Sequence, residues 1–178
     1  APAECENVTL NFSGSSLSGK VSLKAPSTLF DGTAASGELT INVLANGEQL
    51  GTVAAEWGAE VEIPVDLSSK GAGSYEFTIF ASNGVGDGPK TKIKNVWVGA
   101  DTPQATTATL AYVNGNMEIS WQPVTASVNG GYLDLDKLTY TVKDMAGAVV
   151  AQGLTETSYT KPVAEPETLT QYFYTVEA

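Results

Sequence analysis

The sequence predicts an all-β protein made of two tandem β-sandwiches, of which the second lacks its last strand. In residues 75–81 every second side chain is apolar or aromatic, so one face of a pleated strand can be buried while the other faces water. The same pattern returns at residues 172–178. Short segments of this kind, separated by turn-forming residues and without helical periodicity, are typical of a sandwich. The repetition within 178 residues favours two domains.

The first hundred residues contain seven segments with strand periodicity. Pro26 ends the second segment, because proline cannot donate a hydrogen bond to a sheet ladder. Asn46 and Gly47 follow the third segment and supply the positive φ angles that a two-residue hairpin turn needs. A glycine-rich turn, residues 83–88, follows the sixth segment. The expected strands are residues 7–12, 20–25, 39–43, 50–54, 61–67, 75–82 and 90–98.

The pattern restarts after a short linker at residues 99–103. Six further segments have strand periodicity, and no seventh follows them. The expected strands are residues 107–113, 117–121, 138–142, 149–150, 158–163 and 172–178. We therefore predict one sandwich in residues 1–100 and a second, truncated one in residues 101–178.

Three features give the chain a resemblance to a known family. Trp121 is followed closely by Pro123, both alternating strands have the form Tyr-x-Phe/Tyr-x-Ile/Val-x-Ala, and an Asn-Gly-Val-Gly-Asp-Gly turn follows the first of them. Nearly the whole chain thereby resembles tandem fibronectin type III domains, which have an immunoglobulin-like fold. The resemblance implies that the tyrosine-bearing strand is strand F and that the turn is the F–G loop. Leu23 departs from the family, because a tryptophan usually stands in its place.

A second domain without its last strand would have an unpaired edge at residues 172–178. Such an edge recruits another strand. We expect either that the natural polypeptide continues beyond Ala178 or that another chain or a missing segment pairs with this edge. Residues 1–4 resemble residues 101–104, which predicts a further domain before residue 1.

The composition excludes several classes of function. Nine lysines, no arginine and twenty acidic residues give a net charge of -11, which makes nucleic acid an unsuitable partner because its phosphates require a basic surface. The absence of histidine excludes imidazole-based catalysis and histidine metal sites within this chain. Cys5 is the single cysteine and cannot form an internal disulfide, and no apolar run is long enough to span a bilayer. We predict no catalytic residue, no metal and no cofactor.

Four residues are candidates for contact with a ligand or partner: Trp57, Tyr132, Gly86 and Asp87. Trp57 is the aromatic residue that a strand pattern explains least, and an exposed tryptophan flanked by acidic residues can anchor a partner or stack on a sugar. The alternative is a side chain folded over the edge of the sandwich. Tyr132 lies in a loop, while Gly86 and Asp87 belong to the glycine-rich turn.

Two groups of carboxylates could form either a chemical site or an ordinary solvated surface. Asp134 and Asp136 lie in a long loop that could offer oxygen ligands to calcium, although the loop lacks the dense spacing of a calcium site and a solvated turn is the preferred interpretation. Glu56, Glu60 and Glu62 are close in sequence and could form a glycosidase pair. Catalytic pairs need a cleft that small sandwiches seldom have, so we predict that the chain is not an enzyme.

The resemblance implies a non-enzymatic spacer and interaction module of a larger bacterial protein that is exported to the cell surface or beyond it. The neighbouring domains of the same polypeptide are the implied partners. The alternative function is an adhesion module that binds a glycan or a protein through exposed loop aromatics.

Overall fold

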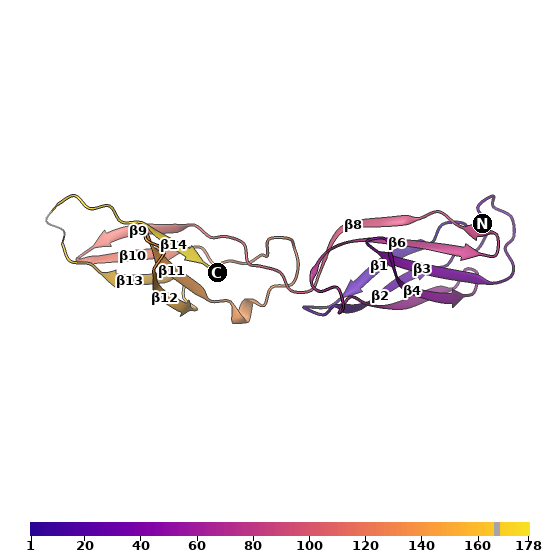
Figure 1. Ribbon diagram of the computed structural model, residues 1–178, viewed down its shortest axis with the longest axis horizontal. Coiled ribbons are helices and arrows are strands. Elements are labelled where there is room, and N and C mark those ends of the chain that lie inside the picture. The colour runs from indigo at the N-terminus through magenta and orange to yellow at the C-terminus, as the bar shows by residue number, and fades with distance from the viewer. Residues whose placement is uncertain (166–167) are drawn as a thin grey trace. The chain divides into compact units, whose positions relative to one another are not determined.

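The computed structural model describes residues 1–165 and 168–178 (Figure 1). The chain forms two compact units, Ala1–Asp101 and Thr102–Ala178. Both are built from short antiparallel strands with tight turns between them. Within the described residues, no helix is both long and apolar enough to cross a membrane.

The first unit consists of two β-sheets. One sheet places β2 (Ser18–Lys24) between β1 (Glu6–Phe12) and β5 (Glu60–Asp66). The other sheet consists of β3 (Leu39–Ala45), β4 (Glu48–Ala55), β6 (Gly73–Asn83), β7 (Gly86–Asp87) and β8 (Thr91–Val98). In it β3 pairs with β4 and β6, and the other edge of β6 pairs with both β7 and β8. The hairpin turn between β3 and β4 has the expected positive φ angles, 50° at Asn46 and 83° at Gly47.

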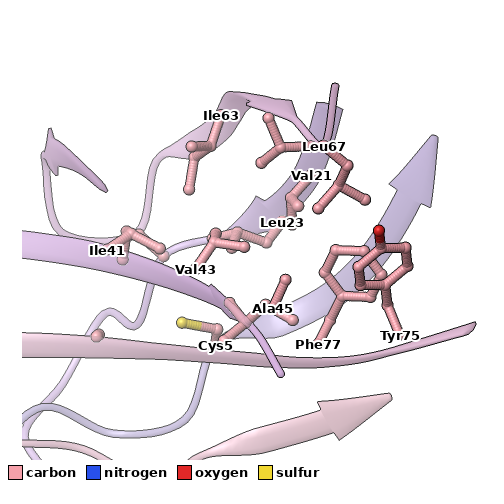
Figure 2. Packing of buried hydrophobic residues seen from close by; sticks show 14 of the residues in the cluster. Cys5, Val21, Leu23, Ile41, Val43, Ala45, Ile63, Leu67, Tyr75 and Phe77 are labelled. Carbon is pink, nitrogen blue, oxygen red and sulfur yellow. The ribbon is translucent and has the colours of Figure 1, made fainter. Parts of the chain in front are cut away.

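The alternating side chains of the two sheets meet in one core (Figure 2). Leu23 of β2, Val43 of β3 and Phe77 of β6 are at most 2% exposed. The rings of Phe12 and Phe77 lie 5.9 Å apart and tilted, a favourable geometry for aromatic side chains. Burial of this apolar surface is the main force that holds the sheets together.

The second unit repeats this plan on a smaller scale. One sheet places β10 (Asn116–Trp121) between β9 (Ala108–Val113) and β13 (Ser158–Pro162). The other places β11 (Tyr140–Asp144) between β12 (Val149–Leu154) and β14 (Tyr174–Glu177). Within the described residues, no strand of this unit occupies the place of β8. The predicted sandwich without its last strand is therefore confirmed.

The strand register shows that β11 and β14 of the second unit correspond to β3 and β6 of the first. Val43 lies opposite Ile79 in the first unit, and Val142 lies opposite Val176 in the second. Trp121 is 5% exposed and packs edge-on against Tyr140 with ring centroids 5.4 Å apart, as expected of a core tryptophan.

Two short elements and one boundary differ from the expectations. The two-residue strand β7 and the 3-10 turn η1 (Leu135–Lys137) are too short to leave a periodic pattern. Strand β14 begins at Tyr174, two residues later than the periodicity of residues 172–178 suggests.

Candidate interaction surface

The turn between β6 and β8 carries two of the predicted contact residues. The side-chain oxygen of Asn83 accepts hydrogen bonds from the N–H groups of Val85 (3.0 Å) and Gly86 (3.2 Å). These bonds fold the turn back, so that Gly86 pairs with Asn83 and Asp87 with Ser82. The turn leaves the side chain of Val85 83% exposed.

The N-terminal segment lies beside this turn and holds the loop that connects β2 to β3. Pro2 bridges to Leu29, the N–H of Ala3 donates to the carbonyl oxygen of Thr28, and the N–H of Phe30 donates to that of Ala1, both at 3.0 Å. The backbone of Phe30 is thus fixed, while its side chain is 73% exposed.

These segments enclose a hollow of about 460 Å³, here called the apical hollow. Its lining residues are Ala1, Leu29, Phe30, Asp31, Asp87, Gly88 and Pro89. Asp31 accepts hydrogen bonds from the side chain (2.6 Å) and the N–H (3.0 Å) of Thr33, and these bonds lower the pKa of Asp31 below its ordinary value. Asp87 forms an ion pair with Lys90 at 3.3 Å. The apical hollow therefore combines apolar side chains with two carboxylates.

Trp57 lies at the same end of the first unit. It follows β4, and Ala55 at the end of β4 lies opposite Leu39 at the start of β3. The indole N–H of Trp57 donates to the carbonyl oxygen of Gly37 at 2.9 Å, and the ring is half-buried against the core. The tryptophan thus holds the loop that carries Phe30 at Gly37.

Tyr132 belongs to the second unit, whereas Trp57, Gly86 and Asp87 belong to the first. The side chain of Tyr132 is 40% exposed and lines a separate hollow of about 360 Å³ together with Ser127 and Leu135. The hydroxyl of Ser127 donates to the carbonyl oxygen of Gly131 at 2.9 Å and closes this loop on itself.

Two of the carboxylates singled out in the sequence form ion pairs with lysine side chains. Asp134 forms an ion pair with Lys137 at 3.0 Å, which occupies one side of its carboxylate. Glu62 pairs with Lys20 at 2.6 Å, and neither it nor Glu56 nor Glu60 lines the apical hollow. Within the described part of the chain, no group of three or more histidine, cysteine, aspartate or glutamate side chains could hold a metal ion.

Cys5 lies in the core of the first unit and is 5% exposed (Figure 2). Burial, with a smaller contribution from the charge of Glu4, raises the pKa of the Cys5 thiol to about 11. The thiol is therefore neutral near pH 7, and a neutral thiol is a poor nucleophile.

Phe30 is an exposed aromatic residue of the apical hollow that the sequence patterns did not single out. A usable signal exists, because a large apolar residue stands directly before the Asp31-Gly32 turn and outside every alternating segment. Such a residue has no strand face on which to be buried.

The strand order decides the fold of both units. A sheet of the first, second and fifth strands faces a sheet in which the third and sixth strands pair, and the Tyr75 hydroxyl bonds back to the carbonyl oxygen of Gly71 at 2.6 Å, as in a tyrosine corner. Both units are therefore immunoglobulin-like β-sandwiches, the fold that the resemblance to fibronectin type III domains implies. Within the described residues, the sandwich formed by Thr102–Ala178 differs from the first in the open edge of β14.

Comparisons with known proteins give structural neighbours only. No protein-family model matches the chain, and no curated protein matches it. Three solved structures are similar to the chain: the central fibronectin-III array of RIM-binding protein (17% identity, TM-score 0.36), the BSP domain of a biofilm-associated protein (15%, 0.32) and the FN1–FN3 domains of chicken CNTN1 (16%, 0.37). In the same order, the matched regions include 99, 95 and 98% of this chain and 62, 26 and 60% of the chains in those structures. The chain thus spans less than two thirds of each, and the assignment rests on the strand order.

Proposed function

We propose that this pair of fibronectin type III-like domains is a non-enzymatic spacer and interaction module of a larger secreted or cell-surface protein. The observation that carries the proposal is the apical hollow, where Phe30 is 73% exposed on a loop whose backbone is fixed. Single exposed aromatic side chains beside a hollow are frequent anchors of protein partners.

The loop of Phe30 is organised before any partner arrives. The N-terminal segment holds its backbone, and the indole of Trp57 holds it again at Gly37. A preorganised loop loses little conformational entropy on binding, so more of the contact energy remains for affinity. This rigidity supports an interaction role.

The chemistry of the apical hollow favours a protein segment that carries an apolar and a cationic side chain. Phe30 and Leu29 offer apolar surface, while Asp31 and Asp87 offer carboxylates. Asp87 is exposed and pairs with Lys90 at 3.3 Å. A lysine or arginine of the partner would therefore compete with Lys90 for the carboxylate of Asp87. Apolar contact would supply most of the affinity, because exposed ion pairs contribute little.

Glycan binding at Tyr132 is the second candidate function. The tyrosine ring is 40% exposed and lies beside a hollow of about 360 Å³ with polar lining residues such as Ser127. Aromatic rings that are partly exposed can stack on sugar rings. Trp57 supports this function less, since its indole N–H is already bonded to Gly37.

A location outside the cell or at its surface, in a bacterial protein, belongs to the same proposal. The tandem arrangement of two sandwiches supports a role in holding neighbouring domains apart, and a net charge of -11 keeps an exposed module soluble.

Photo-crosslinking in the full-length protein tests the interaction role. A photoreactive phenylalanine at position 30 should crosslink one defined partner, and the same group at Met145, which is 69% exposed in the second domain, should not. Phe30→Ser should reduce capture of that partner at least about tenfold without changing thermal unfolding, because the side chain is exposed. Equal crosslinking at both positions would contradict a specific apical surface.

A further inference from the structure

Four asparagines in the chain directly precede a glycine, at residues 46–47, 83–84, 114–115 and 129–130. Such a pair is chemically labile, because glycine has no side chain that hinders attack of its backbone nitrogen on the asparagine side-chain amide. In a folded protein, the reaction also depends on how firmly the fold holds that amide. The hydrogen bonds of each asparagine therefore distinguish pairs that the sequence leaves equivalent.

Two of these pairs have the same backbone conformation. Each forms a two-residue hairpin turn, one between β3 and β4 and the other between β9 and β10. The φ angles are 50° at Asn46 and 83° at Gly47, and they are 49° at Asn114 and 79° at Gly115. Positive angles at both positions belong to the turn type that asparagine–glycine pairs favour in hairpins. The φ angles thus give no reason for the two pairs to react at different rates.

Strand β6 holds Asn46 in place. The N–H of Glu76 donates a hydrogen bond to the side-chain oxygen of Asn46, and the N–H of Asn46 donates to the carbonyl oxygen of Glu76, both at 2.9 Å. The side-chain oxygen of Asn83 is held in a similar way by the N–H groups of Val85 and Gly86. Each of these amides must break its hydrogen bonds before it can turn toward the backbone nitrogen that attacks it.

The side-chain amide of Asn114 is not held in this way. The residue is exposed, and within the described residues its side-chain amide has no hydrogen-bond partner. The side chain of Asn116 donates to the backbone carbonyl oxygen of Asn114 at 3.4 Å and does not engage that amide. Asn129, in the fourth pair, takes part in an interaction of the fold. The amide of Asn114 is therefore free to turn toward the backbone nitrogen of Gly115.

We propose that Asn114 deamidates spontaneously in the folded chain, whereas the fold protects Asn46 and Asn83. The backbone nitrogen of Gly115 attacks Cγ of Asn114 and loses its proton, while the bond between Cγ and Nδ2 breaks and the side-chain nitrogen leaves with that proton as ammonia. The product is a cyclic succinimide. Water, the co-reactant, then opens the ring at either carbonyl group and yields aspartate or isoaspartate. No electron is transferred, and the new carboxyl group is ionised near pH 7.

The two products affect the second domain differently. Aspartate adds a negative charge to a domain whose residues 102–178 contain three lysines and eight acidic residues. It tolerates the positive φ angle of position 114, so the turn is retained. Isoaspartate inserts a methylene group into the backbone of the turn and should loosen the pairing of Asn116 with Val113, because the turn sets the register of the hairpin. The reaction needs no partner and is independent of the apical hollow.

Peptide mapping of the intact chain by mass spectrometry, after incubation at mildly alkaline pH, tests the proposal, since alkali favours loss of the glycine amide proton. Residues 114–115 should convert at least about tenfold faster than residues 46–47 and 83–84, because the latter pairs must first break hydrogen bonds. In urea those bonds are lost, and the three rates should become similar. A rate ratio that persists in urea would show that the local sequence sets the rate, and it would overturn the proposal.

Substitution by glutamine is the matched test, because its longer side chain closes the corresponding ring far more slowly. Asn114→Gln should strongly reduce the more acidic species that ion-exchange chromatography separates after incubation. Asn46→Gln is the control and should leave that species in place. Conversion at residues 46–47 or 83–84 as fast as at residues 114–115 in the folded chain would overturn the proposal. So would an unchanged Asn114 after a time in which the unfolded chain converts fully.

Discussion

The hydroxyl of Tyr75 donates a hydrogen bond of 2.6 Å to the carbonyl oxygen of Gly71, four residues earlier. The bond ties the start of β6 to the turn that precedes it, and the tyrosine side chain is 6% exposed. Its ring lies 6.2 Å from that of Phe77, so the same side chain also extends the aromatic cluster of the core. Tyr75 thus joins a loop to the core of the first domain.

Removing this hydroxyl should destabilise the first domain. We expect Tyr75→Phe to lower its free energy of unfolding by about 1 kcal/mol, because the carbonyl oxygen of Gly71 loses its partner in a partly buried place. Urea unfolding of the intact chain measures the effect. Tyr112→Phe is the control, since Tyr112 is 49% exposed, and it should leave the first domain unchanged. Equal stability of the Tyr75→Phe chain would show that the hydrogen bond contributes nothing.

Gly88 allows the N-terminal segment to approach the turn between β6 and β8. A Cβ atom at this position would lie 2.6 Å from the carbonyl oxygen of Pro2 and 3.1 Å from that of Ala3. Backbone atoms cannot move aside cheaply, so Gly88→Ala should destabilise the first domain by about 2 kcal/mol. Gly84→Ala in the same turn meets nothing within 4 Å and is the matched control. Similar stabilities of the two variants would refute the close approach.

Asp66 should make the stability of the first domain depend on pH. Its carboxylate accepts hydrogen bonds from the side chain (2.5 Å) and N–H (2.9 Å) of Ser68 and from the side chain of Ser18 (3.0 Å), which lower the pKa of Asp66 below its ordinary value of 3.8. A lowered folded-state pKa means that the stabilisation is present above pH 3.8 and is lost as the pH falls through the folded-state value.

Asp66→Asn should therefore reduce the urea midpoint of the first domain at about pH 6, and the difference from the unchanged chain should shrink toward about pH 2. Asp136→Asn, in the second domain, should leave the first-domain midpoint unchanged at both values. A deficit of constant size across this range would show that Asp66 acts through something other than its charge.

The strands were predictable because the burial of every second side chain produces a local alternating pattern in the sequence. Residues such as Val43 and Ile79 face the core from alternate positions, and that alternation is visible in the sequence without any knowledge of pairing. The repeat of the tyrosine-bearing strand was visible for the same reason. The start of β14 was not, because Tyr172 continues the alternation but lies outside the residues that pair with β11.

The apical hollow could be predicted only in part. Gly86 and Asp87 stand in an evident turn, whereas the exposure of Phe30 depends on pairing between residues 1–3 and 28–30. The indole N–H of Trp57 is bonded to Gly37, which is twenty residues away in the chain. Contacts between distant segments leave no periodic pattern, and for this reason neither this bond nor the exposure of Phe30 could be predicted from the sequence.

Hydrogen–deuterium exchange of β6 and β14 in the intact, monomeric chain tests most directly that the second domain repeats the first with one edge left open. In β6, where both edges are paired, the amides should all exchange slowly. In β14, alternate amides point to the open edge and should exchange nearly as fast as those of loops, while the amides bonded to β11 exchange slowly. Uniformly slow exchange along β14 would contradict the open edge.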